Sequence, residues 1–237
     1  MDEITIADFG QPPQSLKDRA IDETSFAYAQ LREDIVSGRV MPNERLVEVD
    51  LAERLTCSRT TVRTILIRLE HEGLVVREPN RGAHVRLISE AEAVEITEAR
   101  ASLEALAARQ AAVHADDKDI ADIQLILSEM APLLESGDLL SYSNTNKRLH
   151  ARILEASRHS TVQRLVGDLK AQLVRFQYRT ILVPGRSQHS LAEHTALVDA
   201  ITRHDPEAAS AAMTAHLSGV AQTLSAISAT TQKERSN

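Results

Sequence analysis

Apolar positions near residue 60 repeat with the period of an α-helix. Four of them follow the spacing i, i+3, i+4, i+7, which puts them on one face of a helix: Val62, Ile65, Leu66 and Leu69. Ser58, directly before this run, can accept a backbone N–H of the first turn, and Gly73, just after it, is suited to end a helix. The pattern predicts a helix over residues 59–72 with a buried apolar face.

The segments on either side of this helix predict a helix-turn-helix followed by a wing. A shorter amphipathic run over residues 51–55 precedes the helix and is separated from it by a break at residues 56–58. After the helix, residues 74–76 and 83–86 have the composition of strands and flank a polar turn that contains Pro, Asn and Gly. We therefore predict two short helices and then a two-stranded wing.

The exposed side of this unit carries residue types that can read DNA. Arg can bridge O6 and N7 of guanine, Thr can contact a phosphate or a thymine methyl, and Gly lets the backbone approach the sugar-phosphate chain. The candidates lie at the first turn of the second helix and at the tip of the wing: Ser58, Arg59, Thr60, Thr61, Arg63, Arg81 and Gly82. Because many small domains contain amphipathic helices, the pattern gains weight only through the agreement of helix, wing and charge.

Positive charge is concentrated in the same stretch. The whole chain carries a formal net charge of −7. Residues 54–86 hold seven Arg against three Glu, a local charge of +4. A protein that coats nucleic acid without regard to sequence would be basic overall, so this distribution favours a specific reader with a local basic surface.

The rest of the chain is predicted to be helical, so that the fold class is mainly α. Residues 1–14 are polar, contain two Pro and show no period, which predicts a mobile extension before a winged helix-turn-helix domain over 15–88. The first helix of that domain is expected to begin near Ser25. Ser89 and Glu92 form a capping box at the start of an all-α domain over 89–237. We predict an antiparallel bundle of six helices there, near residues 90–114, 117–136, 138–157, 160–182, 187–203 and 205–229.

Several absences in the sequence bear on location and activity. No apolar run of about 18 residues and no signal sequence occurs, and the single Cys cannot form an internal disulfide. We expect a cytoplasmic protein with no membrane partner. No nucleophile elbow and no Gly-rich loop occurs either, so we do not expect an enzyme.

Residues 51–86 resemble the GntR family of winged helix-turn-helix regulators. The segments that match are LAERL, SRTTVR, RLEHEGLV and PNRGAHV. The resemblance implies a transcription factor that binds double-stranded DNA. Thr56 and Cys57 stand where the family usually has Gly-Val, and Thr61 stands where it often has Pro, so we do not expect the operator of a relative to serve for this chain.

Three His in the predicted bundle lie on three different helices. Asn146 and His150 are four residues apart and share a helix face, while His194 and His216 lie in the middle of two other helices. Imidazole is the usual ligand of Zn or Ni, so the three could converge on a metal ion. A lone helical His is more often a surface or hydrogen-bonded residue, and the pattern alone is therefore a weak signal.

Residues from 90 to about 220 are similar to the FadR C-terminal domain class of GntR regulators, and a count of six helices resembles its VanR-type branch. The segments that carry the similarity are EAR and LE within 98–104, Asn146 to His150, SLAEH and MTAH.

The resemblance implies that His150, His194 and His216 hold a divalent ion, Zn or Ni, beneath a pocket for a small carboxylate effector. Asn146 stands where the class has Asp, and its neutral amide oxygen would be a weaker ligand. The alternatives are a decayed site and direct hydrogen bonding of Asn146 to an effector without a metal.

Two arginines are candidates for binding the effector. By the resemblance, Arg100 can pair with an effector carboxylate through two hydrogen bonds. Arg175 lies four residues before Arg179 on one helix face and can line the pocket, although a solvated basic face is the alternative.

The function expected from these patterns is that of a ligand-responsive transcriptional regulator, acting as a repressor. A homodimer would bind an inverted-repeat operator, because a two-fold dimer requires a two-fold site, and the effector would shift the relative placement of its DNA-binding domains. One alternative is a metal-dependent hydrolase, for which no suitably placed carboxylate base is identifiable. The other is a DNA-binding protein without effector control.

Overall fold

The computed structural model describes residues 16–78, 81–173 and 176–235, and the chain forms two compact units, Met1–Arg86 and Leu87–Asn237. The extension predicted over residues 1–14 lies outside the described residues. The described helices include none long and apolar enough to cross a membrane.

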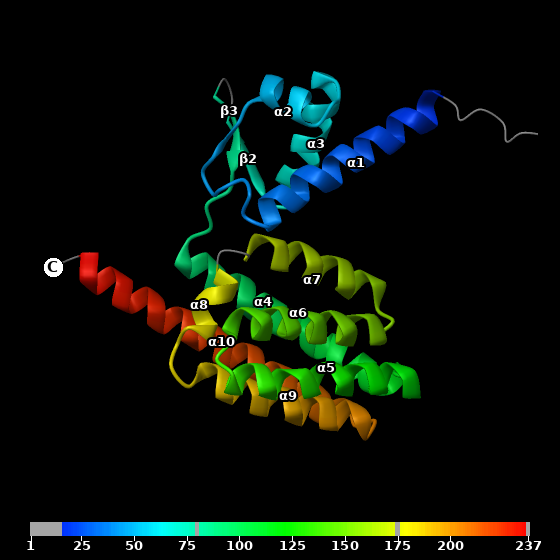
Figure 1. Cartoon of the computed structure of the whole chain (residues 1–237), viewed down its shortest axis with the longest axis vertical. Coiled ribbons are helices and arrows are strands. Elements are labelled where there is room, and N and C mark those ends of the chain that lie inside the picture. Colours follow the sequence, from blue (N-terminus) through cyan, green and yellow to red (C-terminus); the bar gives the residue numbers. More distant parts are fainter. Residues whose placement is uncertain (1–15, 79–80, 174–175, 236–237) are drawn as a thin grey trace, which may run out of the picture. The chain divides into compact units, whose positions relative to one another are not determined.

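The first unit combines three helices with a small antiparallel sheet (Figure 1). The helices are α1 (Leu16–Val36), α2 (Glu48–Arg54) and α3 (Arg59–His71), and the strands are β1 (Arg45–Leu46), β2 (Val75–Glu78) and β3 (Gly82–Val85). The strand order is β1-β3-β2, with Val75 opposite Val85 and Arg45 opposite His84. The predicted two-stranded wing is therefore part of a three-stranded sheet.

Two features of this unit differ from the sequence-based expectation. Helix α1 begins at Leu16 and not near Ser25, because no Pro or Gly interrupts the intervening residues and most of them are good helix formers. Strand β1 has only two residues, and it is recognisable through its pairing with β3, which lies about 40 residues later in the chain.

The apolar face predicted for the second helix forms the centre of this unit. Val62, Ile65, Leu66 and Leu69 are all buried on α3. Leu31 of α1 and Val75 of β2 are buried as well, and α3 contacts both of these elements. Burial of one face of α3 leaves its opposite face, and its first turn, free for solvent or a ligand.

The second unit is built from helices. Their bounds are α4 (Glu90–His114), α5 (Asp117–Glu135), α6 (Leu139–Ala156), α7 (Ser160–Gln172), α8 (Gln177–Ile181), α9 (Arg186–Thr202) and α10 (Pro206–Arg235). Helix α4 lies alongside α10 and also contacts α6, α7 and α9, while α5 packs against α6 and α9 (Figure 1). The buried face of α4 is rich in Ala, whose small side chains allow close helix packing: Ala101, Ala105, Ala108 and Ala112.

The helix expected over residues 160–182 is divided in two. Helix α7 ends at Gln172 and α8 begins at Gln177. Leu173, which follows α7, and Phe176, which precedes α8, lie in one apolar cluster that also contains Ile96. No Gly or Pro near these two residues indicates the break in the sequence. The resemblance to the VanR-type branch depends on a count of six helices. The second unit has this count only if α7 and α8 are taken as one interrupted helix.

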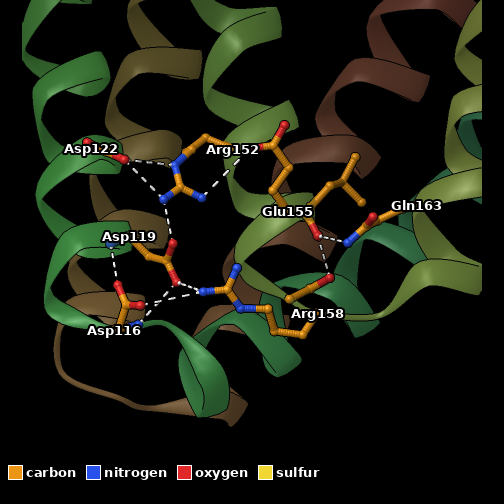
Figure 2. A network of polar contacts seen from close by, with 9 residues as sticks. Asp116, Asp119, Asp122, Arg152, Glu155, Arg158 and Gln163 are labelled. Carbon is orange, nitrogen blue, oxygen red and sulfur yellow. Dashed lines mark hydrogen bonds and ion pairs between the residues drawn. The ribbon is translucent and has the colours of Figure 1, made fainter. Parts of the chain in front are cut away.

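A network of charged residues ties the start of α5 to the end of α6 (Figure 2). Asp116 caps α5 and forms a capping box with Asp119. Asp119 is buried and accepts hydrogen bonds from Arg152 and, at 2.7 Å, from Nη2 of Arg158. Asp122 also accepts from Arg152, at 3.1 and 3.2 Å. The network fixes α6, which carries Asn146 and His150, against α5.

Candidate nucleic-acid interface and metal centre

The first turn of α3 has the geometry predicted for it. Ser58 is the N-cap, and its Oγ accepts the N–H of Thr61 at 3.0 Å and lies 2.9 Å from Oγ1 of Thr61. The side chains of Arg59 and Arg63 are 60% and 57% exposed, and Thr60 is exposed too. These side chains can therefore approach a groove without any rearrangement of the core.

The wing presents its predicted residues at the surface. The side chain of Arg81 is 82% exposed and lies 3.5 Å from Glu78. Gly82 has a φ of 88°, a left-handed conformation that costs little only for Gly. The side chain of Arg81 and the backbone of Gly82 are thus both open to a sugar-phosphate chain.

The sheet also carries a basic depression that the sequence patterns did not indicate. Its volume is about 460 Å³, and its lining residues are Asn43, Arg45, Glu78, Arg81, Ala83 and His84. Arg45 and His84 face each other across β1 and β3, and Arg45 makes no ion pair with any residue that the structure describes. The basic surface therefore extends from the tip of the wing along its strands.

Three buried His come together in the second unit. His150 of α6, His194 of α9 and His216 of α10 each offer one ring nitrogen, and these nitrogens all lie within 4.8 Å of one another. The ring centroids are 4.3 to 5.2 Å apart. The helical positions predicted from the sequence thus converge on one point.

Carboxylates orient two of the three rings. Nδ1 of His150 lies 2.9 Å from Oε2 of Glu104, and Nδ1 of His216 lies 2.8 Å from Oε2 of Glu193. An ionised carboxylate only accepts hydrogen bonds, so each Nδ1 carries the proton and each Nε2 keeps its lone pair. This arrangement is typical of His residues that bind metal through Nε2.

Burial keeps the three imidazoles neutral near pH 7. It lowers the pKa of His150 to about 4, although the hydrogen bond with Glu104 opposes the shift. Burial, together with His216 and His150, lowers the pKa of His194 well below its usual value, and burial lowers the pKa of His216 against the effect of Glu193. Neutral imidazole is the form that binds a metal ion.

The donor atoms of this cluster fit a divalent ion. Nε2 of His150 and Nε2 of His194 are 3.2 Å apart, and two ligands about 2.1 Å from one ion and about 90° to 110° apart are about 3.0 to 3.4 Å from each other. Oδ1 of Asn146 and Nδ1 of His194 are buried without a hydrogen-bond partner among the described residues. An amide oxygen and imidazole nitrogens are suitable ligands for Zn or Ni.

Arg100, a predicted effector contact, is held by a carboxylate of its own helix. Its Nε and Nη2 donate to Oε1 of Glu104 at 2.9 and 2.7 Å. Lys170 of α7 lies 3.2 Å from the other oxygen of Glu104. Burial by itself would raise the pKa of Glu104, but Lys170, Arg100 and His150 together hold it well below its usual value. Arg175, the other predicted contact, lies outside the described residues.

A second buried cation supports the other carboxylate. Nη1 and Nη2 of Arg186 donate to Glu193 at 2.9 and 3.0 Å, and Nη2 also lies 3.3 Å from the carbonyl oxygen of His216. A Cβ at Gly219 would lie 3.3 Å from both Nη2 of Arg186 and Oε1 of Glu193. The absence of a side chain at Gly219 therefore leaves room for this pair beside α10.

Two family models match the chain. Residues 23–85 match the model described as bacterial regulatory proteins, gntR family, and residues 95–219 match the FCD domain. The chain belongs to the GntR family of bacterial regulators, in the class with an FCD domain. GntR regulators with an FCD domain are DNA-binding transcriptional regulators, and the predicted family and fold class are thereby confirmed.

Curated relatives and solved structures agree with this assignment. The chain is 26% identical over 197 residues to the HTH-type transcriptional repressor RspR of Escherichia coli K12, covering 83% of this chain and 86% of RspR. It is 28% identical over 207 residues to the HTH-type transcriptional regulator BphR of Paraburkholderia xenovorans, covering 84% and 83%. The solved structure of E. coli McbR/YncC has a TM-score of 0.69 at 21% identity and covers 85% of this chain and 96% of its own.

The GntR assignment places both candidate sites inside matched domains. The exposed arginines of α3 lie within the segment that matches the gntR model, and all three clustered His lie within the FCD match. Glu104 and Glu193, which orient two of these His, also lie within it and were not predicted as site residues. Glu104 lies four residues after Arg100 and Glu193 directly precedes His194, but neither position indicates which His the carboxylate contacts.

Proposed function

We propose that this GntR regulator is a repressor that senses a small carboxylate through a divalent ion in its helical unit and binds an inverted-repeat operator as a homodimer. The observation that carries the proposal is the convergence of His150, His194 and His216, two of them oriented by carboxylates. The similarity to the repressor RspR supports repression, as opposed to activation, as the mode of regulation.

Three imidazoles and the amide oxygen of Asn146 would hold the ion, Zn or Ni. When bound, such an ion supplies a Lewis-acidic centre for an oxygen of the effector. Asn146 adds no charge where an Asp would add one negative charge, so the cluster favours an anion more strongly. Glu104 and Glu193 keep Nδ1 of their His partners protonated, which directs the Nε2 lone pairs into the cluster.

Two cations near the cluster favour an acidic effector. Arg100 uses Nε and Nη2 for Glu104, so an effector carboxylate would share this guanidinium with Glu104. Lys170 adds a second positive charge beside the same carboxylate. Because the imidazoles are neutral, they add no charge, and the charges of Glu104, Arg100 and Lys170 sum to +1. This local excess of positive charge attracts an anion. We keep Arg175 as a proposed contact of the effector.

The regulatory step is a shift between two arrangements of the dimer. The effector would bind one relative placement of the two winged units more tightly than the other, and only one placement would match the spacing of the operator half-sites. A ligand without such a difference in affinity would leave the equilibrium unchanged.

Measurements of metal affinity test the part of the proposal that places a divalent ion in the helical unit. Asn146→Asp adds a charged ligand and should tighten Zn or Ni binding by about tenfold or more, whereas His194→Ala should weaken it by about a hundredfold. Asn144→Asp adds the same charge to an exposed position of α6 and serves as the matched control. Affinity is measured by competition with a chromophoric chelator. Equal affinities for the two Asp variants, with no loss in His194→Ala, would remove the metal from the proposal.

Small carboxylic acids test the effector. A thermal-shift screen with and without the ion should find acids that raise the melting temperature only in the loaded protein, and the same acids should release a duplex selected from a random-sequence pool. Acids that stabilise the protein equally with a chelator present would point to binding without a metal. A screen in which no acid alters either property would favour the alternative of a regulator without effector control.

A further inference from the structure

A carboxylate lies between the two arginines that are predicted to read DNA. Oε2 of Glu48 accepts a hydrogen bond from Nε of Arg63 at 2.9 Å and lies 3.7 Å from Nη2 of Arg59. Glu48 is the first residue of α2, whereas both arginines belong to the first turns of α3. The contact is therefore made between the two helices of the helix-turn-helix, at the end of α3 that would enter a groove.

We propose that Glu48 determines the specificity of DNA binding by orienting Arg63 and by opposing contacts with phosphates. This role rests on the proposed reading of DNA by α3. Arg63 uses Nε for Glu48, which leaves its Nη1 and Nη2 without a hydrogen bond to any described residue. A guanidinium presented by its two Nη groups is suited to O6 and N7 of guanine. Glu48 thus reduces the conformational freedom that Arg63 would otherwise lose on binding.

The same carboxylate lowers the affinity for DNA of arbitrary sequence. Arg59 and Arg63 carry two positive charges and Glu48 one negative charge, so this part of the surface has a net charge of +1. Nonspecific affinity depends on the number of phosphates that are neutralised and not on base identity. A base contact can compensate for the repulsion between Glu48 and the phosphates, whereas a random sequence offers no such contact.

Two substitutions of Glu48 test the charge and the length of its side chain separately. Glu48→Gln should bind a random-sequence 30-bp duplex about three to ten times more tightly than wild type, and the slope of log affinity against log salt should steepen by about 0.9 per winged unit. Affinity for a duplex selected by the wild-type chain should change less, so the ratio of specific to random affinity falls. Glu48→Asp keeps the charge but shortens the side chain, and should loosen base preference while random-duplex affinity stays near that of wild type.

Glu53→Gln is the matched control, because Glu53 is an exposed residue of the same helix and forms no ion pair with any described residue. Identical random-duplex affinity and salt slope in Glu48→Gln and Glu53→Gln would overturn the role of Glu48. Equal weakening of both duplexes by Glu48→Gln, with a lowered melting temperature, would show a contribution to folding alone and would overturn it too. Failure of the wild-type chain to bind any duplex would instead overturn the DNA-reading function, and with it this role.

Discussion

The charged side chains singled out in the two units differ in how deeply they are buried. In the winged unit, Arg59, Arg63 and Arg81 have side chains that are more than half exposed, and their acidic partners are exposed or half-buried. In the helical unit, Glu104 and Asp119 are buried and each accepts from more than one cation. Surface ion pairs contribute little to stability, whereas removal of one member of a buried pair leaves an uncompensated charge. We therefore expect substitutions to affect ligand binding in the first unit, and both stability and ligand binding in the second.

The largest effect on stability is expected at Glu104. Glu104→Gln leaves Arg100 and Lys170 without their carboxylate and should lower the unfolding free energy by about 3 kcal/mol. The measurement is urea unfolding with a chelator present, combined with hydrogen exchange of the α4 and α6 amides. Glu129→Gln is the control, because Glu129 forms an exposed pair with Arg148 and should cost less than about 1 kcal/mol. Equal costs would refute the contrast between buried and exposed charge.

The next largest effect, at Asp119, depends on pH. Burial alone would raise the pKa of Asp119, but the hydrogen bonds from Arg152 and from the backbone N–H of Asp116 lower it below its usual value. A lowered folded-state pKa gives stability that is present above the unfolded-state pKa of about 3.9 and is lost as the pH falls through the folded-state value. Asp119→Asn should cost about 2 kcal/mol at pH 7.

The free-energy difference between wild type and Asp119→Asn should stay constant above about pH 5 and shrink below about pH 4. Urea unfolding at several pH values gives this difference directly. Asp117→Asn, at an exposed position in the first turn of α5, should show neither the cost nor the pH dependence. A difference that does not change between pH 7 and pH 3 would argue against an ionised, hydrogen-bonded Asp119.

In the winged unit, Arg59→Ala should affect binding and not folding. Loss of a two-point guanine contact should cost about 1 to 3 kcal/mol on a selected operator and relax base preference at one position. The unfolding free energy should change by less than about 0.5 kcal/mol. Arg39→Ala removes another exposed Arg, which pairs with Asp34 at 2.7 Å, and controls for net charge. An equal loss on operator and random duplexes would assign Arg59 to phosphate contact.

The smallest effect is expected at Thr56, between α2 and α3. Thr56 has a φ of 52°, a left-handed conformation that costs a residue other than Gly about 1 to 2 kcal/mol. Thr56→Gly removes that strain but increases the entropy of the unfolded chain, so it should stabilise the winged unit by about 0.5 to 1 kcal/mol. Hydrogen exchange of the α2 and α3 amides reports the change. Thr64→Gly, at an exposed position inside α3, should instead destabilise, and a similar loss in both variants would contradict the strain.

Local sequence signals were sufficient to predict helix α3. The period of Val62, Ile65, Leu66 and Leu69, the Ser58 cap and the Gly73 terminator all lie within 16 residues, and helix formation depends on such short-range relations. Most helices of the second unit were predicted for the same reason, with ends within a few residues of those found. The break between α7 and α8 was missed, because it results from the burial of Leu173 and Phe176 against distant helices.

The sequence by itself determined most of the helices and the two strands of the wing, the local concentration of positive charge, and the helical positions of Asn146 and the three His. Only the tertiary structure decided which side chains meet: Glu104 with His150, 46 residues apart, Glu193 with His216, 23 apart, and Glu48 with Arg63, 15 apart. Adjacent helical residues point about 100° apart, so Glu193 can contact a ring on α10 while His194 beside it joins the cluster. Such contacts depend on how each helix is rotated and offset against its neighbours, which long-range packing sets and no local pattern encodes.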